Sequence, residues 1–469
     1  MPNAQVVELK MKLRLCLDCK FQNNLFEKLE TLVSSFFCIF PIQKNELMTE
    51  DFLYYLWQYR LIIRDIETTI GEPITLIDMG QRNEGSGPDF FNARLKIGNT
   101  EWAGNVEMHT KASDWLRHNH DKDANYDSVI LHVVYDCDMM IRNATDEEIP
   151  CLELKGKIDE KLYFRYRNLI ASREWIACAP QLNEVSDLII YSWLDRLLAE
   201  RLERKTEYIE DFLHSSKGNW ETAFYYALAR NFGFNVNADP FEQLARSIPL
   251  EVLAKNRDSL FRIEALLFGQ SGMLNTRLKD DYSQRLITEY DFLKKKYQLE
   301  PIAGYQWKFM RLRPGNFPSI RIAQFAQLIF KSTHLLSKIV KTEKLSQLKE
   351  FFQLEASDYW NDHYSFGKKS KSKVKRMGES SFDLILINTL VPFLFVYANH
   401  QQNIELRERA LSFLTQTKAE QNSIVKRFKE TGITTNNAAQ SQALLTLKND
   451  YCKYLKCLDC AVGSRLIRK

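Results

Sequence analysis

The chain has 469 residues, 45% of them apolar and 26% charged, which is the composition of a folded globular protein of two or three domains. Its net charge of +4 is too small to predict a nucleic-acid partner by itself, and no uncharged apolar run reaches the roughly 18 to 20 residues that span a bilayer. Nine cysteines without a dense framework are typical of a reducing compartment, so we expect a cytoplasmic protein without a membrane segment.

The first 47 residues fit poorly with the sequence that follows them. We interpret residues 1–47 as an extension of doubtful status, and a small helical appendage is the alternative. The segment "MTEDFLYYLWQYRLI", which begins at Met48, predicts a helix, because Thr49 can cap it and apolar residues follow at helical spacing.

Alternating apolar residues between positions 74 and 137 predict strands. Four strands are expected, in "ITLIDMG", "FFNARLKI", "EWAGNVEMH" and "SVILHVVYD", with a short helix between the third and the fourth. A further strand is expected in "CLELKGKID". The fold class is therefore predicted as α+β or α/β, with a small mixed sheet flanked by helices in residues 48–160.

After about residue 160 the pattern becomes helical almost throughout. We expect residues 161–469 to form a large all-α domain that ends in a cluster of cysteines. The most apolar run, residues 382–398, contains Asp383, Asn388 and Pro392, and it predicts a buried helix.

The hairpin of the second and third strands gives a geometric argument for a site. If the turn after Ile97 has three residues, Ile97 pairs with Glu101 and Asp89 lies opposite His109. Directly opposed residues share a face of the sheet, and so do residues two apart in one strand. Asp89, Glu107 and His109 would then project together.

Two neighbouring carboxylates repel each other, and a divalent cation is the usual remedy. We expect Asp89 and Glu107 to bind Mg²⁺ or Mn²⁺, which can activate a water and neutralise the charge on a phosphodiester. His109 would orient or deprotonate that water, or serve as a ligand itself. His118 and His120 follow closely and could contact a second metal or a phosphate, although solvated side chains are the alternative.

The element order, the "GPDF" that opens the second strand and the acidic residue near the end of the third resemble the core of the PD-(D/E)XK nucleases. The resemblance implies that Asp89 and Glu107 are metal ligands. The position that this family fills with a water-positioning Lys is occupied by His109. Lys111, two residues further on, would substitute for it and contact the scissile phosphate.

From Met48 onward the chain also resembles a bacterial family known as domain of unknown function number 2851. The resemblance is carried by "MTEDFLYYLW", "GPDFFNARL", "GNVEMHTKASDW", "VILHVVYD", "EALLFGQSGML", "RPGNFPSIRIAQFA" and "YCKYLKCLDCAVG". It covers nearly all of the chain, and it implies no activity.

Three cysteines near the end of the chain, in "YCKYLKCLDC", are spaced like ligands for a soft metal. Zinc takes four ligands, and Cys178 is the candidate that completes the set with Cys452, Cys457 and Cys460. Some PD-(D/E)XK nucleases hold an iron–sulfur cluster with three late cysteines and one distant one, so that resemblance allows a cluster as well as zinc. Three thiols without a metal are the alternative.

Basic residues in the helical half could contact nucleic acid. The expected phosphate contacts are Arg313, Lys368, Lys369, Lys371, Lys373, Lys375 and Arg376. The run 368–376 is otherwise a solvated, mobile loop. The sequence therefore predicts a metal-dependent nuclease, and a catalytically inactive nucleic-acid-binding protein or a structural protein is the alternative.

Overall fold

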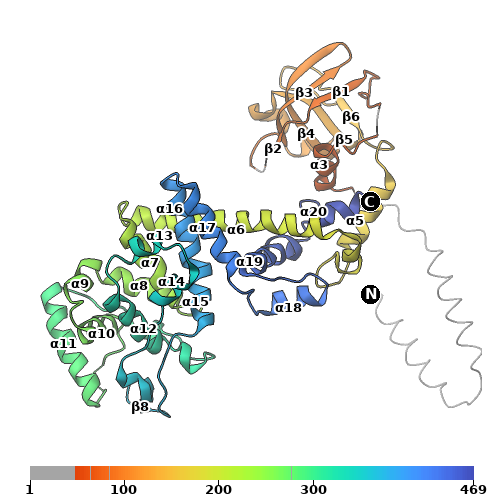
Figure 1. Ribbon diagram of the computed structural model, residues 1–469. Coiled ribbons are helices and arrows are strands. Elements are labelled where there is room, and N and C mark those ends of the chain that lie inside the picture. The colour runs from red at the N-terminus through yellow and green to blue at the C-terminus, as the bar shows by residue number, and fades with distance from the viewer. Residues whose placement is uncertain (1–47, 64, 84, 276) are drawn as a thin grey trace, which may run out of the picture. The chain divides into compact units, whose positions relative to one another are not determined.

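The computed structural model describes residues 48–63, 65–83, 85–275 and 277–469, and it divides into two units between Asp159 and Glu160 (Figure 1). The expectations for residues 1–47 lie outside the described residues. The chain is a mixed α+β protein, as predicted, with a small mixed sheet in the first unit and a large helical second unit.

The first unit is built around one sheet. Its elements are α3 (Glu50–Gln58), β1 (Ile74–Asp78), β2 (Gln81–Arg82), β3 (Phe90–Ile97), β4 (Thr100–Lys111), α4 (Asp114–Arg117), η1 (His120–Lys122), η2 (Ala124–Tyr126), β5 (Val129–Asp136) and β6 (Cys151–Glu153). The strand order is β1-β3-β4-β5-β6, and β2 pairs separately with β3. The pairs β1-β3 and β3-β4 are antiparallel, whereas β4-β5 and β5-β6 are parallel.

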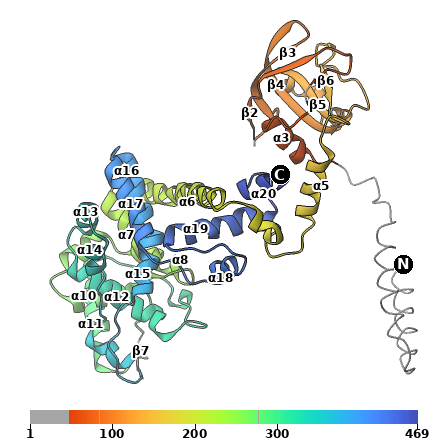
Figure 2. The same cartoon turned by 45° about the vertical axis from the view of Figure 1, so that its right-hand side comes forward.

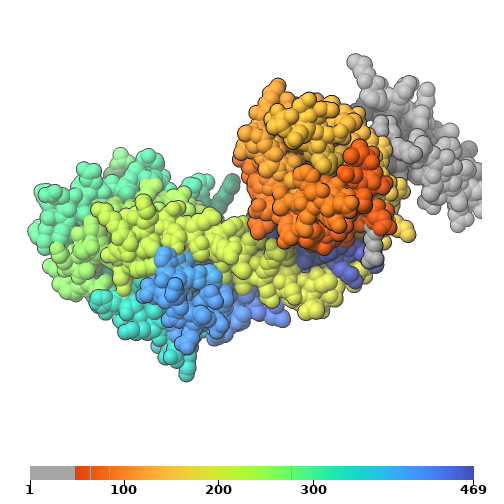
Figure 3. Space-filling view, turned by 90° about the horizontal axis from the view of Figure 1, so that it is seen from above, coloured from red at the N-terminus to blue at the C-terminus, as the bar shows by residue number. Residues whose placement is uncertain are grey.

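Helix α3 packs against the sheet through the apolar face that its sequence predicts. Phe52, Leu56 and Trp57 are buried, and the Trp57 indole donates a hydrogen bond to the Met79 carbonyl at 3.0 Å. In the space-filling view the red residues of α3 adjoin the orange residues of the sheet (Figure 3). The helix thereby places its first turn beside the ends of β3 and β4.

The predicted register of the β3-β4 hairpin is wrong. Ile97 pairs with Thr100, so the turn has two residues, and the pairing is shifted by one from the expected register. A bulge between Phe90 and Ala93 then shifts it again, because two residues of β3 lie opposite Asn105. Asn92 adopts a positive φ of 57° there, a conformation that Asn tolerates better than most residues.

The second unit is almost entirely helical. Its helices are α5 (Glu160–Ile170), α6 (Asp187–Ser215), α7 (Trp220–Phe232), α8 (Ala238–Ser247), α9 (Leu250–Lys255), α10 (Leu260–Gln270), α11 (Asp281–Tyr297), α12 (Pro318–Lys331), α13 (Leu335–Lys341), α14 (Leu345–Phe351), α15 (Glu379–Ile385), α16 (Val391–His400), α17 (Ile404–Gln416), α18 (Ser423–Glu430), α19 (Ala438–Thr446) and α20 (Ala461–Ile467). Helices α6 and α19 lie side by side in both ribbon views (Figures 1 and 2).

Short elements connect these helices. They are η3 (Ala179–Glu184), η4 (Gly304–Gln306), η5 (Pro314–Asn316), η6 (Asp358–Asp362), η9 (Cys452–Tyr454), the π-helical segments η7 (Leu386–Leu390) and η8 (Leu447–Tyr451), and the hairpin strands β7 (His363–Ser365) and β8 (Lys368–Lys369). The basic run 368–376 thus begins in a strand, where a mobile loop was expected.

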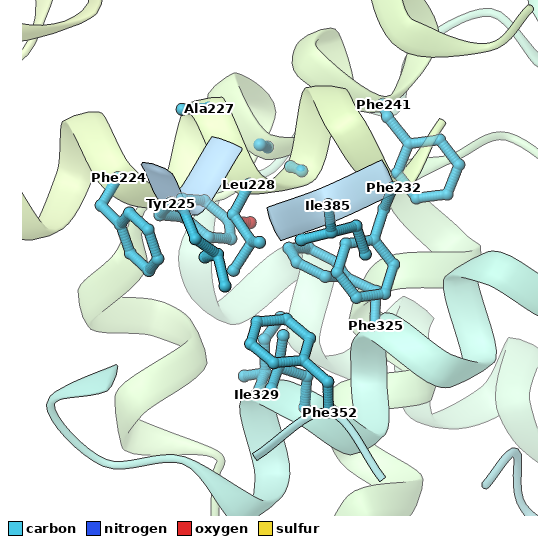
Figure 4. Close-up of a cluster of buried hydrophobic side chains, with 14 of the residues drawn as sticks. Phe224, Tyr225, Ala227, Leu228, Phe232, Phe241, Phe325, Ile329, Phe352 and Ile385 are labelled. Carbon is cyan, nitrogen blue, oxygen red and sulfur yellow. The ribbon is translucent and has the colours of Figure 1, made fainter. Parts of the chain in front are cut away.

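Aromatic side chains fill the core of the second unit. Phe325 of α12 lies between Phe232 and Tyr225 of α7, with ring centroids 4.9 and 5.9 Å away (Figure 4). The helical stretch Glu379–His400 is long and apolar enough to cross a membrane, but 72% of its most apolar window is buried within this unit. Such burial is typical of a core helix of a globular domain.

Candidate functional site

The first unit brings five side chains together at the ends of β3 and β4. Asp89 precedes β3, Glu107 and His109 lie two apart in β4, and His118 and His120 follow α4. The backbone N–H of Asp89 donates to Glu107 Oε2 at 3.1 Å, and Asp89 Oδ2 accepts from the Met108 N–H at 2.9 Å. Asp89 and Glu107 are therefore held side by side.

This convergence depends on the bulge in β3. The two-residue turn alone would place Asp89 opposite Met108, on the other face of the strand from Glu107. The extra residue at the bulge restores the parity, so that Phe90 pairs with Val106 and Asp89 comes beside Glu107. The predicted meeting of Asp89, Glu107 and His109 is thus found, but for a different reason from the predicted one.

Three histidines complete the site. One ligand nitrogen from each of His109, His118 and His120, which we call the histidine cluster, lies within 4.8 Å of the others. Glu107 Oε1 lies 3.5 Å from His109 Nε2 and 3.3 Å from His120 Nε2. His118, which is exposed, and His120, which is half-buried, open the site to solvent, whereas His109 and Glu107 are buried.

A second set of residues holds the histidine cluster in place. His109 Nδ1 lies 2.9 Å from Nε2 of the fully buried His132, which lies directly beside Glu107 on the parallel strand β5. His120 stacks on Tyr126 with ring centroids 3.8 Å apart, and Trp115 lies edge-on to His120. The imidazoles are therefore held by packing as well as by hydrogen bonds.

Burial controls the protonation of these groups. It raises the pKa of Glu107, and the Asp89 carboxylate raises it further, while burial also raises the pKa of Asp89. Burial, followed by the neighbouring histidines, lowers the pKa of His109 to about 2, and burial lowers that of His132 to about 3. His109 is therefore neutral, and it cannot supply the positive charge of a catalytic Lys.

Residues from α3 also reach the site, which the sequence did not suggest. Tyr54 donates a hydrogen bond to the Asp89 side chain, and Glu50, on the same helix face, lies near His118. Burial raises the pKa of both side chains. The spacing of four residues between Glu50 and Tyr54 is the one sequence signal that would have grouped them.

Lys111 does not join the acids. It is exposed at the end of β4, and it lies near Asp138. Two arginines are closer to the carboxylates and the histidines. Arg82 lies 5.3 Å above the Tyr54 ring, and its positive charge lowers the pKa of Asp89. Arg117 pairs with Asp114 at 3.0 Å, and its positive charge contributes to the lowered pKa of His109.

The basic residues of the second unit differ in their surroundings. Lys368, Lys369, Lys371 and Lys373 are exposed, as is Arg313. Lys375 is buried, its ammonium donates to the carbonyls of Asn361 and Lys373, and it lies over the Tyr364 ring. Arg376 pairs with Glu355 at 2.5 Å. Lys375 is thus a structural residue, and the expectation of a phosphate contact is wrong for it.

The four predicted cysteine ligands meet in the second unit. Cys178, Cys452, Cys457 and Cys460 line one cavity, and all four are free thiols.

The sequence model of a family described as "Protein of unknown function (DUF2851)" matches residues 50–423. Because the match covers most of the chain, the protein belongs to this family. A search of curated proteins found no match, and a search of solved structures found none either.

Proposed function

We propose that the first unit is a metal-dependent hydrolase that cleaves phosphodiester bonds in nucleic acid. The observation that carries the proposal is the approach of Glu107 Oε1 to His109 Nε2 and His120 Nε2, at 3.5 and 3.3 Å, beside a histidine cluster that is open to solvent. A carboxyl group and several imidazoles converging on one point are a ligand set for a divalent ion.

The ligand set favours a transition metal over Mg²⁺. Mg²⁺ takes oxygen ligands and waters, whereas imidazole nitrogens suit Zn²⁺, Fe²⁺ and related ions. We therefore propose Zn²⁺, bound by Glu107 and the histidine cluster, with Asp89 fixing Glu107 through its backbone N–H. Such an ion lowers the pKa of a bound water and neutralises charge on a phosphate.

His132 would orient His109 as a ligand. If His109 donates its Nδ1–H to His132 Nε2, its own Nε2 presents a lone pair to the metal. Ligating histidines commonly use their second nitrogen in this way. His109 thus takes the ligand role, rather than that of a water-positioning base.

Two features support nucleic acid as the substrate class. Arg82 and Arg117 are close enough to lower the pKa values of Asp89 and His109, respectively. An anionic substrate group that enters the site would therefore meet positive charge. The sheet is an antiparallel β1-β3-β4 meander followed by the parallel strand β5, with α3 before it and α4 before β5. This order and topology support the resemblance to PD-(D/E)XK nucleases.

The test uses the purified full chain with supercoiled plasmid, single-stranded DNA and RNA, in Mg²⁺, Mn²⁺ or Zn²⁺. Glu107→Gln is expected to reduce cleavage by more than the roughly 10- to 100-fold that loss of a supporting group costs. Glu101→Gln is the matched control, because Glu101 lies in the same strand and is exposed, 2.6 Å from Arg94.

Calorimetry on the same proteins separates the outcomes. Metal binding that Glu107→Gln weakens, together with cleavage, supports the hydrolase. Metal binding and salt-sensitive DNA binding without cleavage would replace it by a non-catalytic nucleic-acid-binding protein. Absence of metal binding would overturn the proposal.

A further inference from the structure

The four thiols that line one cavity of the second unit come from two distant parts of the chain. Cys178 immediately precedes η3, whereas Cys452, Cys457 and Cys460 lie between η8 and α20. We call these four residues the thiol cluster. The cavity that they line is small, about 20 Å³, and it is partly open to solvent. Cys178, Cys452 and Cys457 each lie close enough to Cys460 for its charge to raise their pKa.

The spacing of the sulfurs distinguishes two kinds of metal centre. A single Zn²⁺ with Zn–S bonds of about 2.3 Å holds its four sulfurs about 3.8 Å apart. Among the residues that the structure describes, the histidine cluster is the one group of three or more His, Cys, Asp or Glu side chains whose ligand atoms all lie within 4.8 Å of one another. No three of the four sulfurs of the thiol cluster therefore lie within 4.8 Å of one another, as three ligands of a single zinc ion would.

From this geometry we infer that Cys178, Cys452, Cys457 and Cys460 bind a [4Fe–4S] cluster, one thiolate to each iron. A cubane cluster separates its four cysteine ligands because each binds a different iron. This inference is independent of the hydrolase proposed for the first unit.

Polar groups around the thiol cluster suit an anionic centre. The backbone N–H groups of Val462 and Gly463 donate to the Cys460 sulfur. The buried indole N–H of Trp193 lies next to the same sulfur, and among the described residues no other hydrogen-bond acceptor pairs with it. N–H donors to sulfur stabilise the reduced, more negative state of such clusters.

Two lysines add positive charge. Lys456 lines the cavity, and Lys448 lies near enough to Cys452 to lower its pKa, although burial raises that pKa overall. Four thiolates around a [4Fe–4S]²⁺ core carry a net charge of −2, so two nearby ammonium groups balance it. The sequence places both lysines within the same segment as the late cysteines.

The cluster would join the end of the chain to the start of the helical unit. Helix α20 packs against α5, α6 and η3, and Lys448 donates to the Trp175 carbonyl at 2.5 Å. Gly463 permits this arrangement, because a Cβ there would lie 2.2 Å from the Cys457 carbonyl oxygen. A cluster bound at this point closes a long loop, and we expect it to stabilise the second unit.

The test begins with the full chain purified without oxygen. Four iron and four acid-labile sulfide per chain, with broad visible absorption, are expected. Each of Cys178→Ser, Cys452→Ser, Cys457→Ser and Cys460→Ser should lower the iron content several-fold. Cys137→Ser and Cys151→Ser are the matched controls, since these thiols lie in the first unit and should leave iron unchanged.

A second measurement keeps the test decisive if the variants fold poorly. Wild-type protein stripped of iron and then reconstituted with iron and sulfide should regain its absorption and melt at a higher temperature. One zinc per chain without sulfide, or no metal under either preparation, would overturn the inference. Iron that survives in all four variants would do the same.

Discussion

The backbone N–H of Asp89 donates to the Glu107 carboxylate across an antiparallel strand pair, even though the hairpin turn alone would set these residues on opposite faces of the sheet. The bulge that restores their contact depends on one residue, Asn92, with a φ of 57°. The geometry of the candidate site is therefore controlled by a backbone conformation three residues from Asp89.

Asn92→Val should disrupt both stability and metal binding. A left-handed backbone conformation costs a residue other than Gly or Asn about 1–2 kcal/mol, and a β-branched side chain increases this cost. We expect the free energy of unfolding in urea to fall by at least about 1 kcal/mol, with weaker Zn²⁺ binding by calorimetry. Asn92→Gly, which tolerates the same φ, should preserve both properties, and equal losses in the two variants would contradict this role for the bulge.

His132→Ala should weaken metal binding without removing a ligand. His132 contacts Nδ1 of His109 at 2.9 Å, and loss of such a supporting group typically costs about 10- to 100-fold in metal affinity. Calorimetric titration with Zn²⁺ measures the change. His214→Ala, which alters an exposed histidine at the end of α6, serves as the control and should have no effect. An unchanged affinity in His132→Ala would exclude the positioning role.

Glu264→Gln should remove a pH dependence from the stability of the second unit. Burial raises the pKa of Glu264 from 4.5 to about 7, although Tyr282 and Ser357 donate hydrogen bonds to it. The folded protein holds this proton more tightly than the unfolded chain. The stabilisation is therefore complete below pH 4.5 and is lost as the pH rises to about 7.

The difference between these two pKa values corresponds to roughly 3 kcal/mol. Urea unfolding of Glu264→Gln and of the parent protein across this pH range measures it. As the pH rises, the free energy of unfolding should fall in the parent relative to the variant, because only the parent loses the stabilisation by the protonated carboxyl. A constant difference between the two proteins would show that burial does not raise the pKa of Glu264.

Gly463→Ala should displace the Cys457 segment, because its new Cβ would meet the Cys457 carbonyl at 2.2 Å. Overpacking of this kind typically costs about 1–3 kcal/mol. Thermal unfolding and iron content should both decrease. Gly315→Ala is the matched control, since nothing lies within 4 Å of a Cβ at that position. Normal iron content in Gly463→Ala would show that the close approach of Gly463 to Cys457 is not needed for iron binding by the thiol cluster.

Replacement of the exposed lysines of β8 and of the segment after it tests whether these residues contact nucleic acid. If Lys368, Lys369, Lys371 and Lys373 each neutralise one phosphate, replacing all four with Ala should lower the salt dependence of duplex DNA binding. The slope of log K against log salt should fall by about 3 to 4. Fluorescence anisotropy at several salt concentrations measures it.

A control variant with four scattered exposed lysines replaced has the same net charge. It carries Lys255→Ala, Lys279→Ala, Lys295→Ala and Lys331→Ala. Equal changes in slope in the two variants would show that DNA binding, where present, follows net charge rather than this strand.

The sequence by itself determined the secondary structure and the division into a sheet and helices, because period-2 and period-3.6 patterns are local. It also indicated Asp89, Glu107, His109 and the four cysteines as candidate residues of metal sites, because few residue types serve as metal ligands. It could not indicate Tyr54 as a neighbour of the site, since the role of Tyr54 arises from packing between elements.

Tertiary structure decided the register and the partners. A two-residue turn and a bulge each shift the pairing by one in the same direction, so that the register moves by two and the parity is restored, which local patterns cannot predict. Only the folded chain brings Cys178 to the late cysteines, and only packing buries Lys375 within an otherwise exposed basic run. Burial also sets the charge of His109, because desolvation depends on neighbours from the whole unit rather than on adjacent residues.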